Sequence, residues 1–346
     1  MRNPTKARSA RWNNAQKFIF FLSLGLALLL LFIFLYLILG TKIYSISDVF
    51  QSIFNYTESV DAQYYIHETR MPRLIADLIV GASLSVAGII MQGTTKNPMA
   101  DSGIMGISQG STLGVVVIVA FFPTAGRYEK MGMATLGAAL VTALIYLVAI
   151  VGRRKITTDR MVLSGMAIST LLSSLSSAII LKNGLMNEMV RYTSGSSANT
   201  IWSDVHIALP FFTFGVIAAL VISRSLTVMN LGEDVSKGLG ANTKVVGTLS
   251  TIIVLILSAV AVVIIGPVSY IGLMIPYIAR YLVGTDYRFS LPICAIYGGV
   301  FVLLVDLIAK MIKPGLEFPI GLLITLVGVP FFIYTARRQK GDQFHG

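Results

Sequence analysis

Long apolar segments recur along the whole chain and limit its fold more than any other feature. The first occupies residues 18–39, and a helix needs roughly 20 apolar residues to cross a bilayer. Nine more segments follow, at 71–92, 104–122, 131–151, 161–181, 205–223, 245–265, 266–280, 290–309 and 320–335. Only 12% of the residues are charged, too few to cover a soluble domain of this size. The sequence predicts an all-α polytopic membrane protein with about ten transmembrane helices in a single domain, residues 1–346.

The basic residues indicate how this domain is oriented. The formal net charge is +11, and residues 1–17 carry five Lys or Arg and no acid. An even number of spans puts the N-terminus and the tail, residues 336–346, on the same side. With both termini in the cytoplasm, 18 of the 27 Lys and Arg lie on the inner side, as the positive-inside rule requires. The charge therefore reflects a multi-pass protein of the cell membrane, and no nucleic-acid partner is expected.

Residues for chemistry within this chain are scarce. Cys294 is the single cysteine, and the three histidines are far apart in sequence, so no metal or cofactor site is expected. No Gly-Lys dipeptide occurs, which excludes a phosphate-binding loop of the Walker type. No Ser/His dyad, di-Asp pair or His-Glu-x-x-His motif supports an intramembrane enzyme. The chain is therefore not expected to be an enzyme, and any ATP hydrolysis must come from a partner chain.

Two apolar segments are interrupted in a way that simple hydrophobic hairpins are not. Residues 70–73 read Arg-Met-Pro-Arg and open a segment that closes on Gln92. An irregular, Gly- and Pro-punctuated loop follows, and its notable residues are Asn97, Pro98, Ala100, Gly106 and Gly110. Such residues indicate helices packed closely, or backbone that lines a cavity.

The second interruption predicts a broken entry and a kink in the eighth span. It contains Gly266, Pro267, Gly272 and Pro276 in an otherwise apolar run. The two interruptions fall in corresponding places of spans two to five and spans seven to ten. This correspondence suggests an internal repeat, a feature found in several classes of membrane carrier.

Residues 224–244 are the most distinctive inner segment. They predict a short amphipathic helix, a glycine break and a restart capped by Asn242. The residues that carry the pattern are Leu231, Gly232, Glu233, Lys237, Gly238, Leu239 and Gly240. A solvated loop between two spans is the simpler alternative.

These motifs, in this order, resemble the permease subunit of ABC importers for ferric siderophores, haem and cobalamin. The resemblance implies a dimer of permease chains, identical or related, with two ATPase subunits inside and a substrate-binding protein outside. It assigns residues 231–240 to ATPase coupling, and it assigns Arg70, Arg73 and Lys310 to docking of the binding protein. Spans five and ten resemble the helices that line the family's pathway. A ferric siderophore is the first choice of substrate, and haem and cobalamin stay open. The chain departs from the family at Tyr192, where Trp is usual, and at Tyr277, where His is more common.

Two carboxylates inside predicted spans offer a different reading. Asp77 is four residues from Arg73, and Asp306 is four from Lys310, so each pair shares a helix face. We expect these acids to hold the docking charges in position. Because intramembrane carboxylates also mark proton relays, a proton-coupled secondary transporter using Asp77 and Asp306 is the alternative.

Overall fold

The computed structural model describes residues 13–40, 42–101, 106–151, 158–240, 242–312 and 318–343. Within these ranges the regular structure is entirely helical. Most of the basic N-terminal segment, and residues 152–157 of the basic inner loop, lie outside the described ranges.

Ten of the helices correspond to the ten predicted spans. They are α1 (Asn14–Ile38), α4 (Met71–Thr95), α5 (Ile107–Phe121), α6 (Arg127–Val151), α7 (Thr158–Lys182), α9 (Trp202–Asn230), α11 (Thr243–Ile265), α12 (Ile271–Val283), α13 (Tyr287–Ile312) and α14 (Ile320–Gln343). Shorter elements join them: α2 (Ile46–Phe54), α3 (Asp61–Tyr65), the π-helix η1 (Ile66–Arg70), α8 (Met186–Thr193) and α10 (Glu233–Gly238). Among the described helices, six are both long and apolar enough to cross a membrane, which makes the chain a multi-pass membrane protein.

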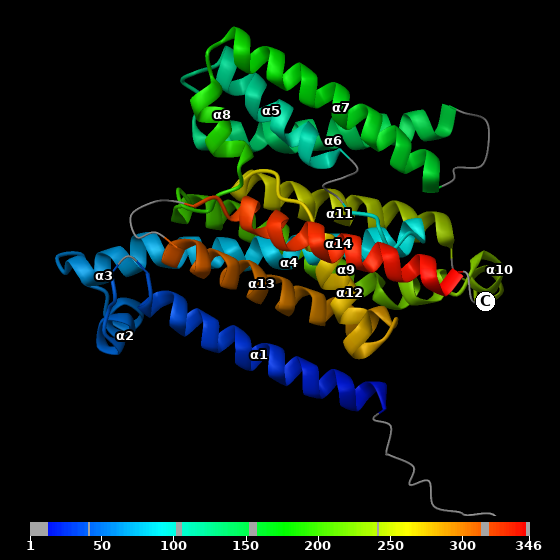
Figure 1. The fold of residues 1–346 in the computed structure, drawn as a ribbon, viewed down its shortest axis with the longest axis horizontal. Coiled ribbons are helices and arrows are strands. Elements are labelled where there is room, and N and C mark those ends of the chain that lie inside the picture. Colours follow the sequence, from blue (N-terminus) through cyan, green and yellow to red (C-terminus); the bar gives the residue numbers. More distant parts are fainter. Residues whose placement is uncertain are drawn as a thin grey trace, which may run out of the picture.

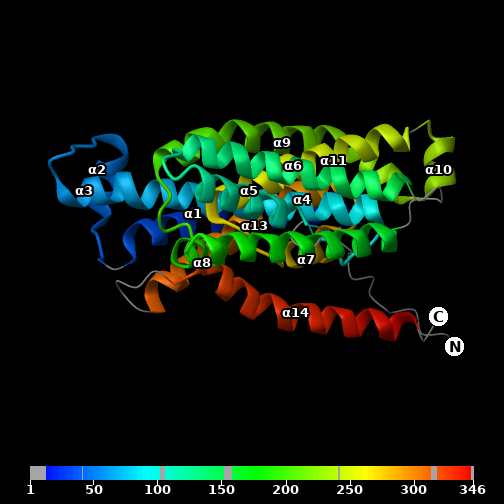
Figure 2. The same cartoon turned by 90° about the horizontal axis from the view of Figure 1, so that it is seen from above.

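The long helices run roughly side by side, with the short elements at the two ends of the bundle (Figure 1). Helices α2, α3 and α8 lie at one end, called here the α2 end. Helix α10 lies at the other, the α10 end, where α1 begins and α14 finishes (Figure 2). Helix α4 is the centre and packs against α1, α9, α11, α12 and α13. Helices α5, α6 and α7 form a second layer, which joins the first through α11.

Small residues let α4 pack unusually close to its neighbours. A methyl group on Gly81 would overlap the carbonyl of Gly298 in α13, and one on Gly88 would overlap the backbone of Gly272 in α12. Small residues at contacts allow helix backbones in membranes to approach and gain van der Waals contact. Helix α4 is therefore held as a buried axis within the bundle.

Both predicted interruptions are present, and each leads into a short helix. Helix α12 has 13 residues and α5 has 15, lengths of about 20 and 22 Å, whereas the hydrocarbon core is about 30 Å thick. Each begins after a residue of positive φ, Gly106 at 87° and Tyr270 at 74°. The eighth predicted span thus consists of a non-helical stretch, 266–270, and a half-length helix that contains Pro276. A short helix thus follows each break, and the internal repeat stays a prediction.

Candidate functional site

Five buried side chains form a charge cluster near the α2 end. They come from α1 (Tyr36), α4 (Arg73 and Asp77) and α13 (Asp306 and Lys310). Arg73 donates two parallel hydrogen bonds to Asp306, from Nε to Oδ2 at 2.9 Å and from Nη2 to Oδ1 at 2.5 Å. Lys310 Nζ lies 3.5 Å from Asp306 Oδ2. Two cations thus share one carboxylate that is fully shielded from solvent.

Tyr36 completes the cluster from α1. Its hydroxyl donates to Asp306 Oδ2 at 2.5 Å and lies 3.3 Å from Asp77 Oδ2. The ammonium of Lys310 sits 3.3 Å from the centre of the tyrosine ring, a cation–π contact. The other carboxylate oxygen of Asp77, Oδ1, is buried without a hydrogen-bond partner among the described residues. The cluster therefore joins three helices through one carboxylate.

This arrangement corrects the expected pairing of Asp77 with Arg73 along α4. Arg73 pairs across helices with Asp306, because that carboxylate accepts both of its parallel N–H groups, the strongest geometry open to a guanidinium. The expected pairing of Lys310 with Asp306 along α13 is present. Asp77 instead faces the hydroxyl of Tyr36, a residue that the sequence analysis did not single out.

Arg70 is also held inside the protein. Its Nη1 donates to the carbonyl of Leu37 at 2.5 Å and its Nη2 to that of Lys42 at 2.6 Å. The rings of Tyr44 and Tyr65 flank the guanidinium, at 4.6 and 5.5 Å from their centres. Arg70 is 4% exposed, and Arg73 is 8% exposed. Neither arginine presents its charge at the surface in this structure, because carbonyls, aromatic rings and Asp306 offer it closer partners than water.

The motif loop after α4 connects the two broken segments. Gln92 Nε2 donates to the carbonyl of Gly272 at 3.0 Å, and Asp101 Oδ2 accepts from the backbone N–H of Tyr270 at 3.2 Å. Asn97 stabilises the loop locally by accepting from Met99 N at 2.9 Å. These motif residues act in packing and capping. Asp101, which was not among the residues singled out from the sequence, is the residue that fixes the start of α12.

Gly110, also a residue of the sequence motif, lies on α5 in the second layer. A side chain on Gly110 would overlap the carbonyl of Gly137 and the side chain of Val141, so α5 and α6 touch at this point. Gly110 is therefore a contact residue between helices of the same layer.

The segment predicted for coupling projects from the α10 end as a short helix (Figure 2). Leu231, Val235 and Leu239, spaced four residues apart, are 60%, 50% and 65% exposed. Gly232 and Gly240 have φ values of 114° and 75°, and they separate α10 from its flanking helices. Asn242 caps α11 as predicted, since its side chain accepts from Val245 N at 3.2 Å. The side chains of Glu233 and Lys237 lie outside the described ones.

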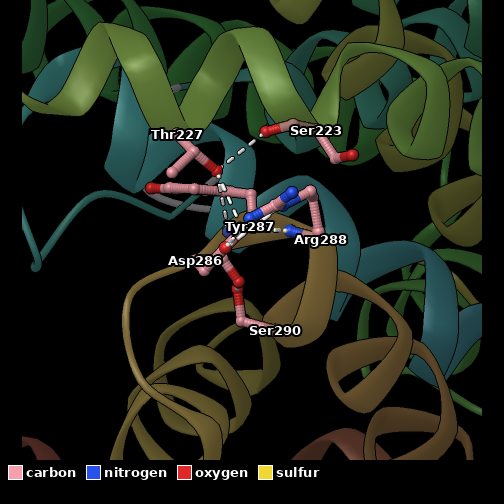
Figure 3. Close-up of polar contacts among 6 residues, drawn as sticks. All are labelled: Ser223, Thr227, Asp286, Tyr287, Arg288 and Ser290. Atoms are coloured by element: carbon pink, nitrogen blue, oxygen red, sulfur yellow. Dashed lines mark hydrogen bonds and ion pairs between the residues drawn. The ribbon is translucent and has the colours of Figure 1, made fainter. Parts of the chain in front are cut away.

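Just before this segment in the chain, a polar network joins the end of α9 to the turn between α12 and α13 (Figure 3). The hydroxyl of Thr227 accepts from Tyr287 N at 3.0 Å and lies 3.2 Å from Asp286 Oδ1. Arg288 binds both carboxylate oxygens of Asp286, at 2.7 to 3.1 Å. These hydrogen bonds from Arg288 lower the pKa of Asp286 below its ordinary value. The carboxylate is thus ionised throughout the neutral range.

The described residues contain no group of three or more His, Cys, Asp and Glu side chains placed to hold a metal ion. What they do contain is a set of long apolar helices, two half-length helices, a buried charge cluster and exposed apolar side chains on and beside α10. This combination defines a multi-pass helical membrane protein. Residues 28–338 match the FecCD transport family, and the chain belongs to that family.

Its relatives are permeases of ABC transport systems. The iron(3+)-hydroxamate import system permease protein FhuB of Bacillus subtilis (strain 168) is 37% identical over 87% of this chain and 79% of its own length. The Fe(3+)-citrate import system permease protein YfmD of the same organism is 36% identical over 87% of this chain and 90% of its own. A solved structure described as an inward-facing conformation of a metal-chelate type ABC transporter has a TM-score of 0.81 and 26% identity. That match covers 92% of this chain and 98% of the other. The predicted family is confirmed.

Proposed function

We propose that this chain is the permease subunit of an ATP-driven importer and that α10 is the surface on which an ATPase subunit docks. The observation that carries the proposal is the exposed apolar face of Leu231, Val235 and Leu239. Val235 is on α10, and Leu231 and Leu239 flank this helix, at the end of the bundle where α1 begins and α14 finishes (Figure 2). Exposed apolar side chains on such a short projecting segment are suited to insertion into a partner's groove.

The proposed topology places the α10 end in the cytoplasm of the cell membrane and the α2 end outside. This orientation agrees with the positive-inside rule, and it puts the docking surface where ATP is available. The whole chain, residues 1–346, then serves as one transmembrane domain. Hydrolysis belongs to two separate ATPase chains, since the sequence has no phosphate-binding loop of its own.

A second permease chain is the proposed partner within the membrane. Among the described residues, α7 packs mainly against α5, α6 and α8 and leaves Leu171 and Leu175 largely exposed, while α14 leaves Leu326 exposed. Two exposed serines on α7, Ser173 and Ser177, form a polar strip on the side of the helix turned away from those leucines. Helices α7 and α14 from two chains would enclose a pathway with partly polar walls, in a homodimer or a heterodimer.

The proposed substrate is a ferric chelate of the siderophore class. The relatives FhuB and YfmD are named for iron(3+)-hydroxamate and Fe(3+)-citrate, and both align over most of this chain. Haem and cobalamin are the alternatives within the same family. Competition between iron-loaded hydroxamates, citrate, haem and cobalamin for uptake by the intact system would identify the substrate.

On the outer side, we propose that the surface formed by α2, α3 and η1 receives a substrate-binding protein. Arg70 fixes the chain between α1 and α2, and Arg73 fixes α4 to α13 directly beneath it. Lys310 contacts the ring of Tyr36 and so holds α13 against α1. Their contribution to docking is then to hold that surface in shape. Replacement of Arg70 by Lys, which cannot form the same fork of hydrogen bonds, should weaken binding of the partner protein.

The decisive test of the ATPase contact is a tagged purification from native membranes in mild detergent. Wild-type chain should recover an ATPase, and Leu239→Asp should lose it while staying folded. Phe122→Asp is the matched control, because Phe122 is equally exposed (64%) but lies after α5, away from α10. Recovery of the ATPase by Leu239→Asp, or its absence from the wild type, would refute the proposal.

One observation favours a second candidate, a proton-coupled transporter. Asp77 keeps a carboxylate oxygen buried and unbonded among the described residues, and such a group can exchange a proton. The two mechanisms separate in sealed vesicles. The proton-coupled carrier would transport without an ATPase and lose uptake with Asp77→Asn or a collapsed proton gradient. The ATP-driven importer would keep uptake under both treatments while ATP is supplied.

A further inference from the structure

The helix that leads into the coupling segment is tied to the centre of the bundle. Helix α9 ends at Asn230, one residue before Leu231. Asn230 Nδ2 donates to the hydroxyl of Tyr287 at 2.7 Å, and Thr227 Oγ1 accepts from Tyr287 N at 3.0 Å. Both bonds come from the last turn of α9 and end on a single residue at the start of α13. We call Thr227, Asn230 and Tyr287 the latch.

Tyr287 reaches past α9 to the end of α4. It is 3% exposed, and its hydroxyl lies so close to Gly93 that a methyl group there would overlap it. Asp286 caps the N-terminus of α13, since its Oδ1 accepts from Arg288 N at 3.0 Å. The cap fixes the first turn of α13 and with it the position of Tyr287. The ring is thus wedged among α4, α9 and α13 (Figure 3).

Helices α4 and α13, which meet at this wedge, form a pair joined along its whole length. Near the middle, Gly81 and Gly298 bring their backbones into contact. At the α2 end, Arg73 binds Asp306 through two hydrogen bonds. A displacement applied to one end of such a pair moves both helices as a unit, because packed helices switch between discrete arrangements.

We propose that the latch transmits motion of the coupling segment to the α4–α13 pair, and that its three residues position α10 for this task. The inference rests on the proposed ABC function. The latch is short and polar and lies between a surface for a partner and the central helices. When the hydrogen bonds of the latch are removed, α10 still binds the ATPase, but movement of α10 no longer displaces α4 and α13. ATP hydrolysis then proceeds without transport.

The test compares variants that remove single groups. Tyr287→Phe deletes only the hydroxyl that Asn230 binds, and Thr227→Val deletes the other acceptor. Thr227→Ser keeps the hydroxyl and is the conservative rescue. Tyr297→Phe is the matched control, since Tyr297 is on the same helix and its hydroxyl donates to the carbonyl of Phe21 at 3.0 Å, away from α9.

Each variant is co-expressed with its ATPase and binding-protein partners, reconstituted in proteoliposomes and assayed for substrate taken up per ATP hydrolysed. We expect Tyr287→Phe and Thr227→Val each to lower this ratio about fivefold, the effect of one net hydrogen bond, with ATPase recovery unchanged. The double variant should fall less than the product of the two, because both bonds serve one residue. Thr227→Ser and Tyr297→Phe should keep the wild-type ratio.

Three results would overturn the latch. In the first, Tyr287→Phe and Thr227→Val keep the wild-type ratio. In the second, uptake and hydrolysis fall in equal proportion, which indicates a purely structural role. In the third, Tyr297→Phe lowers the ratio as much as Tyr287→Phe. A wild type that recovers no ATPase would instead refute the proposed function, so the two failures are distinguishable.

Discussion

Removal of the Asp306 carboxylate should be among the most damaging single changes in the bundle. In Asp306→Asn, Arg73 loses an ionised bidentate partner and Lys310 loses the carboxylate 3.5 Å away. Both cations stay buried, because their side chains are only 10% and 13% exposed. Breaking a buried ion pair by removing one partner costs about 3–5 kcal/mol. The midpoint of thermal unfolding should therefore fall by roughly 6–20 °C, at about 2–4 °C per kcal/mol.

The protein provides its own reporter for this measurement. Cys294 is the single cysteine and is fully buried in α13, so a thiol-reactive fluorogenic maleimide reports the opening of that helix. Arg288→Gln is the matched control, because it breaks an Arg–Asp pair whose arginine side chain is 55% exposed. Exposed pairs contribute only about 0–1 kcal/mol. If Asp306→Asn and Arg288→Gln unfold at the same temperature, the cluster does not stabilise the bundle and the reasoning fails.

Three further predictions follow from single contacts. Gly88→Val should abolish the folded protein in detergent, because the new side chain would overlap the backbone of α12. Gly247→Ala has open space around it and should be neutral or stabilising by up to about 1 kcal/mol, and size-exclusion chromatography separates the two outcomes. Tyr36→Phe should lower stability by about 1.5–3 kcal/mol, the value of a hydrogen bond to a charged group, and an unchanged midpoint in the maleimide assay would contradict this. The pKa of Asp286 is lowered by Arg288, so its contribution to stability is complete above the unfolded pKa of about 3.9 and is lost as the pH falls through the lower folded value. The stability difference between wild type and Arg288→Gln should accordingly be constant from pH 5 to 8 and disappear in stronger acid; a change between pH 5 and 8 would contradict the assignment.

Local features of the fold could be predicted because they depend on neighbouring residues. Apolar length located the segments that form the main helices, and glycines and prolines located both breaks. The cap at Asn242 needed only its own side chain and the N–H three residues later. These signals act over a few residues, which is the range in which sequence spacing fixes geometry.

Partners distant in the sequence could not be predicted in the same way. The four-residue rule pairs Asp77 with Arg73, yet Arg73 binds Asp306, 233 residues away. Tyr36 and Tyr287 looked like ordinary aromatic residues of an apolar segment and a turn. Their roles emerge only when three helices meet, because each hydroxyl is placed by elements that its own neighbours do not specify.

The long separations between partners also affect how the protein is made. Asp101 is synthesised 169 residues before its partner Tyr270, and Tyr36 is synthesised 270 residues before Asp306. During synthesis, α4 therefore enters the bilayer carrying Arg73, whose partner Asp306 does not yet exist, a costly state for a charged group in lipid. Only when the ribosome has finished α13 can this charge be neutralised. The first half of the nascent chain must be sheltered until then, by the insertion machinery or by water, and truncated products that end before α13 are natural substrates for membrane quality control.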